Sequence, residues 1–372
     1  MIEQLIKLVG GVIASIVGAV VGWKLSQISL RRKTQISQID HGRQRGRYAI
    51  AVGVFTLLSV GLWTELLRPQ FLAHSLRSQT ADLVRKHKWI AYEPADFNPS
   101  RSGDLDLEVI REELRSIHKA GFDGIITFTS RGAFSEIPKL AKNQGFAVIM
   151  GVWDPGNYAE IGAAISQREY VDAYCVGHDG WPFRYSYDTL IKAIDHVRFR
   201  TGRPVSTTQR INYYLTDQRF LAVGDWLFPD TLLPLIDKEL YVHSIDVKRD
   251  VTTTIELANK LDQINQDHKP ILLKMVGYPA LIDDPDIFSP NNSSSNVPND
   301  AQTKFFIALG NAQKDVGTSL STNISISMYS VFDIRWKRGA PFYDWESQTG
   351  LFEDDGSPRP AVWEIIKRRL HE

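Results

Sequence analysis

Residues 173–208 read AYCVGHDGWPFRYSYDTLIKAIDHVRFRTGRPVSTT, and this stretch contains one complete strand–helix–strand unit. Short apolar runs at Ala173–Val176 and Val205–Thr208 predict two buried strands. Between them, steps of four and three residues separate the apolar positions Leu190, Ile194 and Val197. That spacing predicts a helix with one apolar face, and Gly202-Arg203-Pro204 ends it before the second strand.

The same alternation of apolar runs and amphipathic segments extends in both directions from this unit. Eight runs predict strands: Trp89–Tyr92, Gly124–Phe128, Ala147–Val152, Ala173–Val176, Val205–Thr208, Trp226–Phe228, Ile271–Met275 and Ile324–Tyr329. Eight strands that alternate with helices predict an α/β fold, a closed (β/α)8 TIM barrel over residues 88–372. A doubly wound open sheet is the alternative, but no glycine-rich phosphate loop follows the first predicted strand.

Two apolar segments, residues 8–23 and 48–67, precede the barrel. A spanning helix needs roughly 20 apolar residues, which the second segment supplies and the first approaches. We therefore predict a transmembrane hairpin over residues 1–68, followed by a linker over residues 69–87. The alternative is a signal peptide, but little positive charge precedes the first segment and no small-residue cleavage site leads into the barrel.

The loop between the two apolar segments, residues 24–47, sets the expected orientation. It carries seven Lys and Arg residues against one acid, Asp40. Because positively charged loops stay in the cytoplasm, we expect both termini and the barrel on the periplasmic or extracellular side of the inner (cell) membrane.

Composition excludes several other classes of function. Lys+Arg and Asp+Glu are both 43, so the formal net charge is zero and gives no argument for a nucleic-acid partner. Cys175 is the only cysteine, which excludes an intrachain disulfide and a thiolate metal cluster. The acidic residues Asp283, Asp284 and Asp286 lack the spacing of a calcium-binding loop, and no nucleophile elbow is present. We expect no metal and no cofactor.

Aromatic and polar side chains gather where the predicted strands end. In a (β/α)8 barrel the loops at these ends hold the functional site, and carbohydrate clefts combine stacking rings with hydrogen-bonding groups. Any single ring could instead pack the top of the barrel. The candidate substrate-binding residues are Tyr92, Phe128, Trp153, His178, Trp181, Tyr278, Tyr329, Asp333, Trp336 and Lys337.

Eight motifs, in order along the predicted barrel, resemble the family 17 glycoside hydrolases, the β-1,3-glucanase family. They are GFDGIITF (121–128), GFAVIMGVW (145–153), YCVGHDG (174–180), TGRPVSTT (201–208), GDWLFPD (224–230), KPILLKMVGYP (269–279), FDIRWK (332–337) and GLFEDDGSPRPA (350–361). The resemblance implies a TIM barrel that binds or cleaves β-glucan or a related polysaccharide.

The positions of the family's two catalytic glutamates are altered. Strand 4 of the family ends Val-Gly-Asn-Glu with the acid/base glutamate last, and here Asp179 holds that place, after His178. The family's nucleophile stands two residues before Gly-Tyr-Pro, where this chain has Met275. Retaining hydrolysis needs two carboxyl groups roughly 5–5.5 Å apart, and methionine cannot replace one of them. We therefore expect the retaining mechanism to be impaired.

Other carboxyl groups at strand ends could serve an inverting route, which needs an acid and a base about 6.5–9.5 Å apart. The candidates are Glu93, Asp154 and Asp333. For Asp333 we favour a loop-fixing role, and for Asp154, which precedes Pro155-Gly156, a turn.

Three functions remain open from the sequence. The favoured one is a membrane-anchored domain that binds β-glucan with little or no catalysis. The second is an active hydrolase or transglycosylase that uses Asp179 with another carboxylate. The third is a structural subunit that joins a membrane complex for polysaccharide synthesis or export.

Overall fold

A computed structural model describes residues 78–99, 105–232, 246–280, 301–312, 319–337 and 344–368. All of them belong to one compact unit, Leu72–Glu372. An eight-stranded sheet lies at its centre, with every recorded strand pair parallel. Its strands are β1 (Trp89–Ala91), β2 (Gly124–Ile126), β3 (Ala147–Val152), β4 (Ala173–His178), β5 (Val205–Arg210), β6 (Phe228–Asp230), β7 (Ile271–Val276) and β8 (Ile324–Met328). The prediction of eight parallel strands is confirmed.

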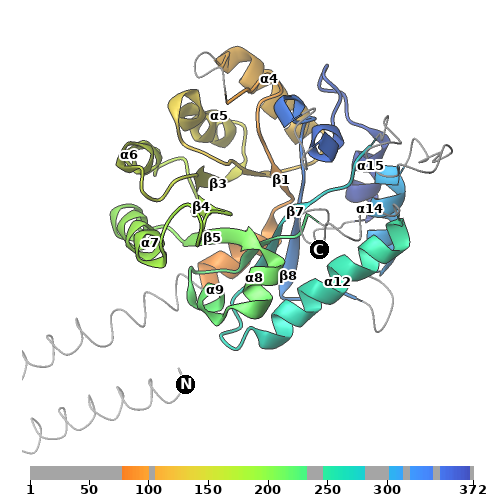
Figure 1. The fold of residues 1–372 in the computed structure, drawn as a ribbon. Helices are drawn as coiled ribbons and strands as arrows, with labels where there is room; N and C mark the ends of the chain where they lie inside the picture. The colour runs from red at the N-terminus through yellow and green to blue at the C-terminus, as the bar shows by residue number, and fades with distance from the viewer. Residues whose placement is uncertain are drawn as a thin grey trace, which may run out of the picture. The chain divides into compact units, whose positions relative to one another are not determined.

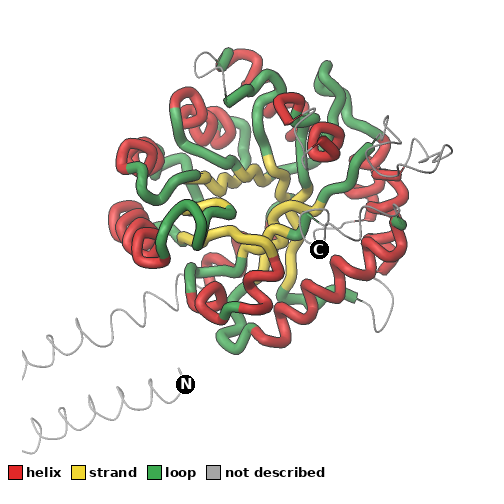
Figure 2. Tube along the Cα trace, viewed as in Figure 1, coloured by secondary structure: helices red, strands yellow, loops and turns green. Residues whose placement is uncertain are grey.

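The sheet curves round until its ends meet, as Figure 2 shows for the strands at the centre of the unit. β1 pairs with both β2 and β8, which joins the first strand to the last. Between β6 and β7 the connection is one parallel bridge, Leu227 with Ile271. Two backbone hydrogen bonds support it: Leu227 N–H donates to the Pro270 carbonyl and Leu272 N–H to the Leu227 carbonyl, each at 2.9 Å. This bridge completes a (β/α)8 barrel.

Helices surround the strands (Figure 1). They are α4 (Leu107–Lys119), α5 (Ile137–Lys142), α6 (Tyr158–Ser166), α7 (Tyr187–Thr201), α8 (Ile211–Thr216), α9 (Gln218–Ala222), α12 (Val247–Ile264), α14 (Ala301–Ala312) and α15 (Pro360–Arg368). The described 3-10 helices are η2 (Gly132–Glu136), η3 (Arg335–Lys337) and η4 (Asp344–Gln348).

Helix α7 has the start, the buried face and the end that its sequence predicts. The Ser186 hydroxyl caps its first turn by accepting from the Thr189 N–H at 3.1 Å. Its apolar stripe is buried against the barrel, and Gly202 ends it with φ of +67°, a left-handed conformation that favours glycine. The buried residues of the stripe are Leu190, Ala193, Ile194 and Val197.

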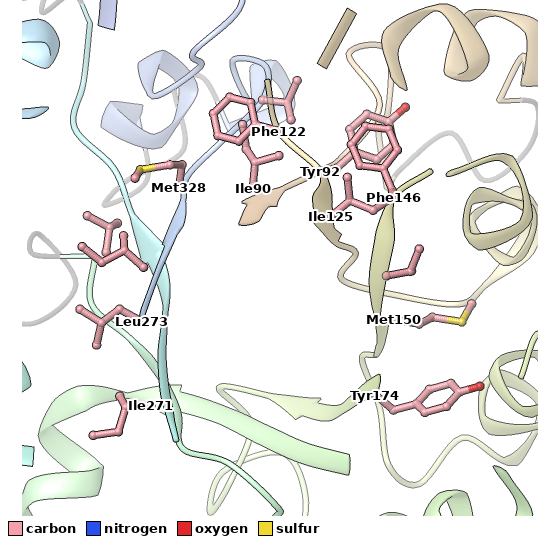
Figure 3. Close-up of a cluster of buried hydrophobic side chains, with 14 of the residues drawn as sticks. Ile90, Tyr92, Phe122, Ile125, Phe146, Met150, Tyr174, Ile271, Leu273 and Met328 are labelled. Atoms are coloured by element: carbon pink, nitrogen blue, oxygen red, sulfur yellow. The ribbon is translucent and has the colours of Figure 1, made fainter. Parts of the chain in front are cut away.

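Apolar side chains form two layers because successive strand residues point to opposite faces. Ile125, Met150 and Tyr174 belong to the larger layer, which fills the space between the strands and the helices (Figure 3). The alternate residues Ile126, Ile149 and Cys175 belong to a second layer inside the barrel.

Residues 78–86 form a helix ahead of β1, within the segment expected to be a linker. Val84 of this helix is buried with the interior layer, and its carbonyl accepts from Trp89 Nε1 at 3.1 Å. The helix therefore packs at the end of the barrel where the strands begin.

The predicted hairpin over residues 1–68, its two spans and its basic loop lie outside the described residues. Among the residues that are described, no helix combines the length and the apolarity needed to cross a bilayer. The acidic stretch 283–286 also falls outside the described ranges.

Candidate functional site at the carboxyl ends of the strands

An irregularity at the end of β7 turns two consecutive side chains towards the barrel axis. The register of β7 against β8 shifts between Leu273 and Val276, and both of these residues pack in the outer layer. Lys274 and Met275, which lie between them, both contact residues on the inner side. A bulge has this effect because its extra residue interrupts the alternation of the strand.

The end of β4 is irregular in the same way. Its register against β5 shifts between Cys175 and His178, and Gly177 has φ of +80°. A Cβ at Gly177 would lie 2.5 Å from the Tyr185 hydroxyl, so only glycine fits. Asp179 also adopts a positive φ, +44°, which is uncommon for a residue with a side chain. This backbone sets the positions of His178 and Asp179 at the mouth.

Lys274 and His178 meet across the barrel. Lys274 Nζ lies 2.5 Å from His178 Nδ1, and the two residues are 1% and 9% exposed. Burial lowers the pKa of Lys274, against the opposing effect of nearby acidic groups. Burial and the charge of Lys274 hold the pKa of His178 well below its usual value. The imidazole is therefore neutral at neutral pH.

Two aspartates lie beside this pair. Burial raises the pKa of Asp179, and burial together with the charge of Asp179 raises the pKa of Asp230 to about 8. One ligand atom each from His178, Asp179 and Asp230 lies within 4.8 Å of the other two. Asp230 ends β6 and Lys274 lies in β7; neither was among the residues expected from the sequence.

Met275, which the sequence resemblance aligned with a nucleophile, lies in an apolar cluster. It is 3% exposed and packs with Ala91, Leu232, Tyr329 and Ile334, with Phe128 at the edge. No carboxyl group stands at this point of β7. Of the expected residues, the structure brings Phe128, Tyr329, His178 and Asp179 into the same region as Met275.

Glu346, in η4, is a buried carboxylate that the sequence reasoning missed. It is 1% exposed and accepts hydrogen bonds from the Tyr329 hydroxyl, at 2.7 Å, and from Lys337 Nζ. Its charge contributes to the raised pKa values of Asp179 and Asp230. Glu346 lies far along the chain from the end of β8. A search for polar residues directly after each predicted strand could therefore not identify it.

Glu93 and Trp336 form the more accessible side of the mouth, between the ends of β1 and β8. Trp336 is 38% exposed, and its Nε1 donates to Glu93 Oε1 at 2.7 Å. Burial raises the pKa of Glu93 to about 7, against the opposing effects of the Trp336 hydrogen bond and the charge of Lys337. A small hollow beside them is lined in part by Phe97 and Phe332.

Trp153 already has two partners at the mouth. Its indole stacks on the His178 ring at 4.7 Å, with 21° between the planes. The Arg184 guanidinium lies 4.7 Å from the indole centroid and also donates to the His178 carbonyl. Stacking on a sugar would therefore compete with these contacts.

Three expected site aromatics lie in the outer layer, away from this cluster. The Tyr92 hydroxyl donates to Glu113 Oε2 at 2.5 Å, and the Tyr278 hydroxyl to Asp250 Oδ2 at 2.9 Å. Trp181 packs on Phe220, with ring centroids 4.2 Å apart. These rings stand near strand ends, but their side chains point towards the helices.

Asp333 and Asp154 have structural partners. Arg359 Nη2 donates to Asp333 Oδ2 at 2.9 Å, and the Gly350 N–H donates to Asp333 Oδ1 at 2.8 Å. The Gly156 N–H donates to Asp154 Oδ1 at 2.8 Å. These contacts fit the loop-fixing and turn roles that the sequence favoured for them.

Several solved structures share this fold, whereas no protein-family model and no curated protein matches the sequence. An endo-laminarinase from Formosa Hel1_33_131 gives a TM-score of 0.56 at 15% identity, over 77% of this chain and 88% of that one. A GH5_18 protein from Streptomyces cattleya, in complex with GlcNAc, gives 0.54 at 15% identity, over 77% and 80%. A GH5_18 protein from Bifidobacterium longum gives 0.54 at 13% identity, over 76% and 79%.

The fold and these likenesses define a class of fold, a (β/α)8 barrel. At such identities the likeness concerns the fold alone. What the mouth of the barrel does has to be argued from its own residues.

Proposed function

We propose that this chain is a membrane-anchored domain, held outside the cytoplasm, that binds β-glucan and lacks the retaining mechanism of the family 17 hydrolases. One observation carries the proposal: the position of the nucleophile is Met275, packed among apolar side chains. A methionine there cannot form the covalent glycosyl intermediate. The fold likeness to glycan-acting enzymes supports a sugar as the ligand.

Trp336 is the residue that we expect to contact the sugar. Its ring is partly exposed at the mouth, and Glu93 and Lys337 place polar groups beside it. An exposed ring flanked by hydrogen-bonding groups suits the alternating C–H and hydroxyl surface of a pyranose.

Binding can be tested on the full chain in detergent, by calorimetric titration with β-1,3-gluco-oligosaccharides. Trp336→Ala should weaken binding at least tenfold. Trp363→Ala is the matched control, because Trp363 is a 55% exposed ring on α15 and has no place at the mouth. Equal affinity of wild type and Trp336→Ala would remove the basis for a sugar site here.

Turnover is tested on the same material by mass spectrometry of the oligosaccharide products. We expect no new chain lengths from the wild-type chain. Shorter or longer sugars that disappear with Asp179→Asn would contradict the non-catalytic proposal.

The second candidate is an active hydrolase or transglycosylase, and the position of Glu346 favours it. This buried carboxylate could act with Asp179, whose raised pKa suits a proton donor. In that case Glu346→Gln and Asp179→Asn should each abolish product formation. Asp154→Asn is the control, because it alters an exposed carboxylate in the loop after β3.

The third candidate, a subunit of a polysaccharide synthesis or export complex, depends on the hairpin over residues 1–68. It predicts a stable complex after mild solubilisation that is lost when these residues are deleted. Recovery of a monomer from membranes would count against it.

A further inference from the structure

A basic and apolar patch lies at the end of the barrel where the strands begin, opposite the mouth. Arg168 follows the end of α6, and Phe199 and Arg200 lie in the last turn of α7. Both arginines are exposed, and the Phe199 ring is 87% exposed. A groove of about 390 Å³ is lined by the two arginines together with Glu169 and residues of α6. We call Arg168, Phe199 and Arg200 the basal patch.

The fold does not use the charges of Arg168 and Arg200. Within the described residues, neither guanidinium forms an ion pair. The aspartates that precede β4 and β6 each pair with a different cation: Asp172 with Lys142, and Asp225 with Arg198. Glu169 supplies one negative charge against the two arginines, so the lining of the groove is net positive.

The chain that precedes the described residues joins the barrel at this same end. The helix over residues 78–86 packs where the strands begin, because Val84 is buried with the interior layer and its carbonyl accepts from Trp89 Nε1. Nine residues, 69–77, connect this helix to the second predicted span, and nine residues extend over roughly 30 Å at most. If residues 48–67 span a bilayer, the lipid surface lies within that reach.

We propose that the basal patch rests on the surface of a bilayer, where Arg168 and Arg200 bind the phosphate groups of anionic phospholipids and Phe199 enters the headgroup layer. The inference rests on the proposed membrane anchor and is independent of sugar binding. Guanidinium groups suit phosphate because they donate two parallel hydrogen bonds to it. Basic residues are attracted to anionic leaflets, and exposed aromatic rings bind at the level of the headgroups. The mouth of the barrel then opens away from the lipid.

The test uses the full chain reconstituted into phosphatidylcholine vesicles, with or without phosphatidylglycerol. A bimane fluorophore is attached at Phe199→Cys, and in a second chain at Tyr158→Cys as the matched control. Tyr158 is 85% exposed and begins α6, so its label lies at the opposite end of that helix from Arg168. The native Cys175 remains unlabelled because it is buried, and burial raises the pKa of its thiol to about 11.

Nitroxide groups carried by the lipids should quench the label at position 199 at least threefold more than the label at position 158. This difference should depend on phosphatidylglycerol, and Arg200→Glu should remove most of it. Lys192→Glu is the control variant, because it reverses an exposed charge in the middle of the same helix, α7. We expect Lys192→Glu to leave the difference unchanged.

Flotation of the vesicles after an alkaline wash shows whether the chain is anchored. Equal quenching at the two positions in vesicles that retain the chain would overturn this proposal and leave the anchor intact. Stronger quenching at position 199 that persists without phosphatidylglycerol and in Arg200→Glu would also overturn it, because the arginines would then play no part. Release of the chain by the wash would remove the anchor, and this proposal with it.

Discussion

At the scale of single residues, burial decides what each carboxyl group at the mouth can do. Glu93 and Asp230 hold protons at pH values where free carboxyl groups have lost them, whereas Glu346 accepts from Tyr329 and Lys337. Asp333 forms an ion pair with Arg359. Residue type alone would assign these acids the same behaviour, and only their neighbours separate them.

The raised pKa of Glu93 predicts how the stability of the barrel changes with pH. Its pKa in the folded chain is about 7, against 4.5 for a free glutamate. Between these values the folded state holds a proton that the unfolded state has released, so stability falls as pH rises from 4.5 to 7 and changes little above that. The loss in the free energy of unfolding is about 3 kcal/mol.

Thermal unfolding followed by tryptophan fluorescence at pH 5, 6, 7 and 8 measures this loss. Glu93→Gln should reduce the difference between pH 5 and pH 8 by several degrees. An unchanged pH dependence in that variant would show that the pKa of Glu93 is not raised by folding.

Truncation of the Arg359 side chain should lower the free energy of unfolding by a large amount. It pairs with Asp333 and Glu353, donates to the Gly350 carbonyl, and is 11% exposed. Arg359→Ala leaves Asp333 without its charge partner and should cost about 3–5 kcal/mol. Arg335→Ala is the control, because its pair with Asp354 is exposed and worth at most about 1 kcal/mol. Denaturant unfolding measures both variants, and an equal loss in the free energy of unfolding would refute the stabilising role of Arg359.

At the scale of elements, two strands end irregularly, and the site depends on both irregularities. The shift in β7 brings Lys274 and Met275 to the same side, and the shift in β4 brings His178 to meet them. Strand positions could be read from the sequence because apolar runs predict them. Bulges could not, because the pattern of apolar residues does not say where one extra residue is accommodated.

Substitution of Gly177 tests how strictly the end of β4 requires its irregular backbone. Gly177→Ala places a Cβ 2.5 Å from the Tyr185 hydroxyl at φ of +80°, so it combines backbone strain with a clash. Gly202→Ala has a similar φ, +67°, and nothing within 4 Å of the new Cβ. We expect about 1 kcal/mol of destabilisation from Gly202→Ala, and at least twice that from Gly177→Ala. Denaturant unfolding of the two variants isolates the clash, and equal losses would show that Tyr185 moves freely.

At the scale of the whole molecule, the sequence predicted the barrel well and its mouth only in part. The predicted strand 147–152 matches β3, and the other seven predicted strands agree to within two residues at each end, because short apolar runs determine them. Tyr92, Trp181 and Tyr278 were expected at the mouth but point outward, since proximity to a strand end does not fix the direction of a side chain. Glu346 was missed because it reaches the mouth from η4.

The helix over residues 78–86 predicts where the folding unit begins. A chain shortened to start at residue 88 loses the burial of Val84 and the acceptor for Trp89 Nε1. Together these should cost about 3 kcal/mol relative to a chain that starts at residue 72. Comparing the thermal unfolding of the two shortened chains measures this, and equal midpoints would mean that the helix contributes nothing.

The seam between β6 and β7, where one bridge joins the two strands, affects how the barrel wall can open. The other neighbouring strands share two to four register pairs each, whereas these two are joined at the bridge between Leu227 and Ile271. Opening there breaks few hydrogen bonds, so the amides of Leu227 and Leu272 should exchange with deuterium sooner than those of β3 and β4. Asp230 and Lys274 lie on the two strands that flank this seam. Brief parting of the barrel wall would let small ions and protons reach the buried cluster from the side, while the apolar residues around Met275 stay in place.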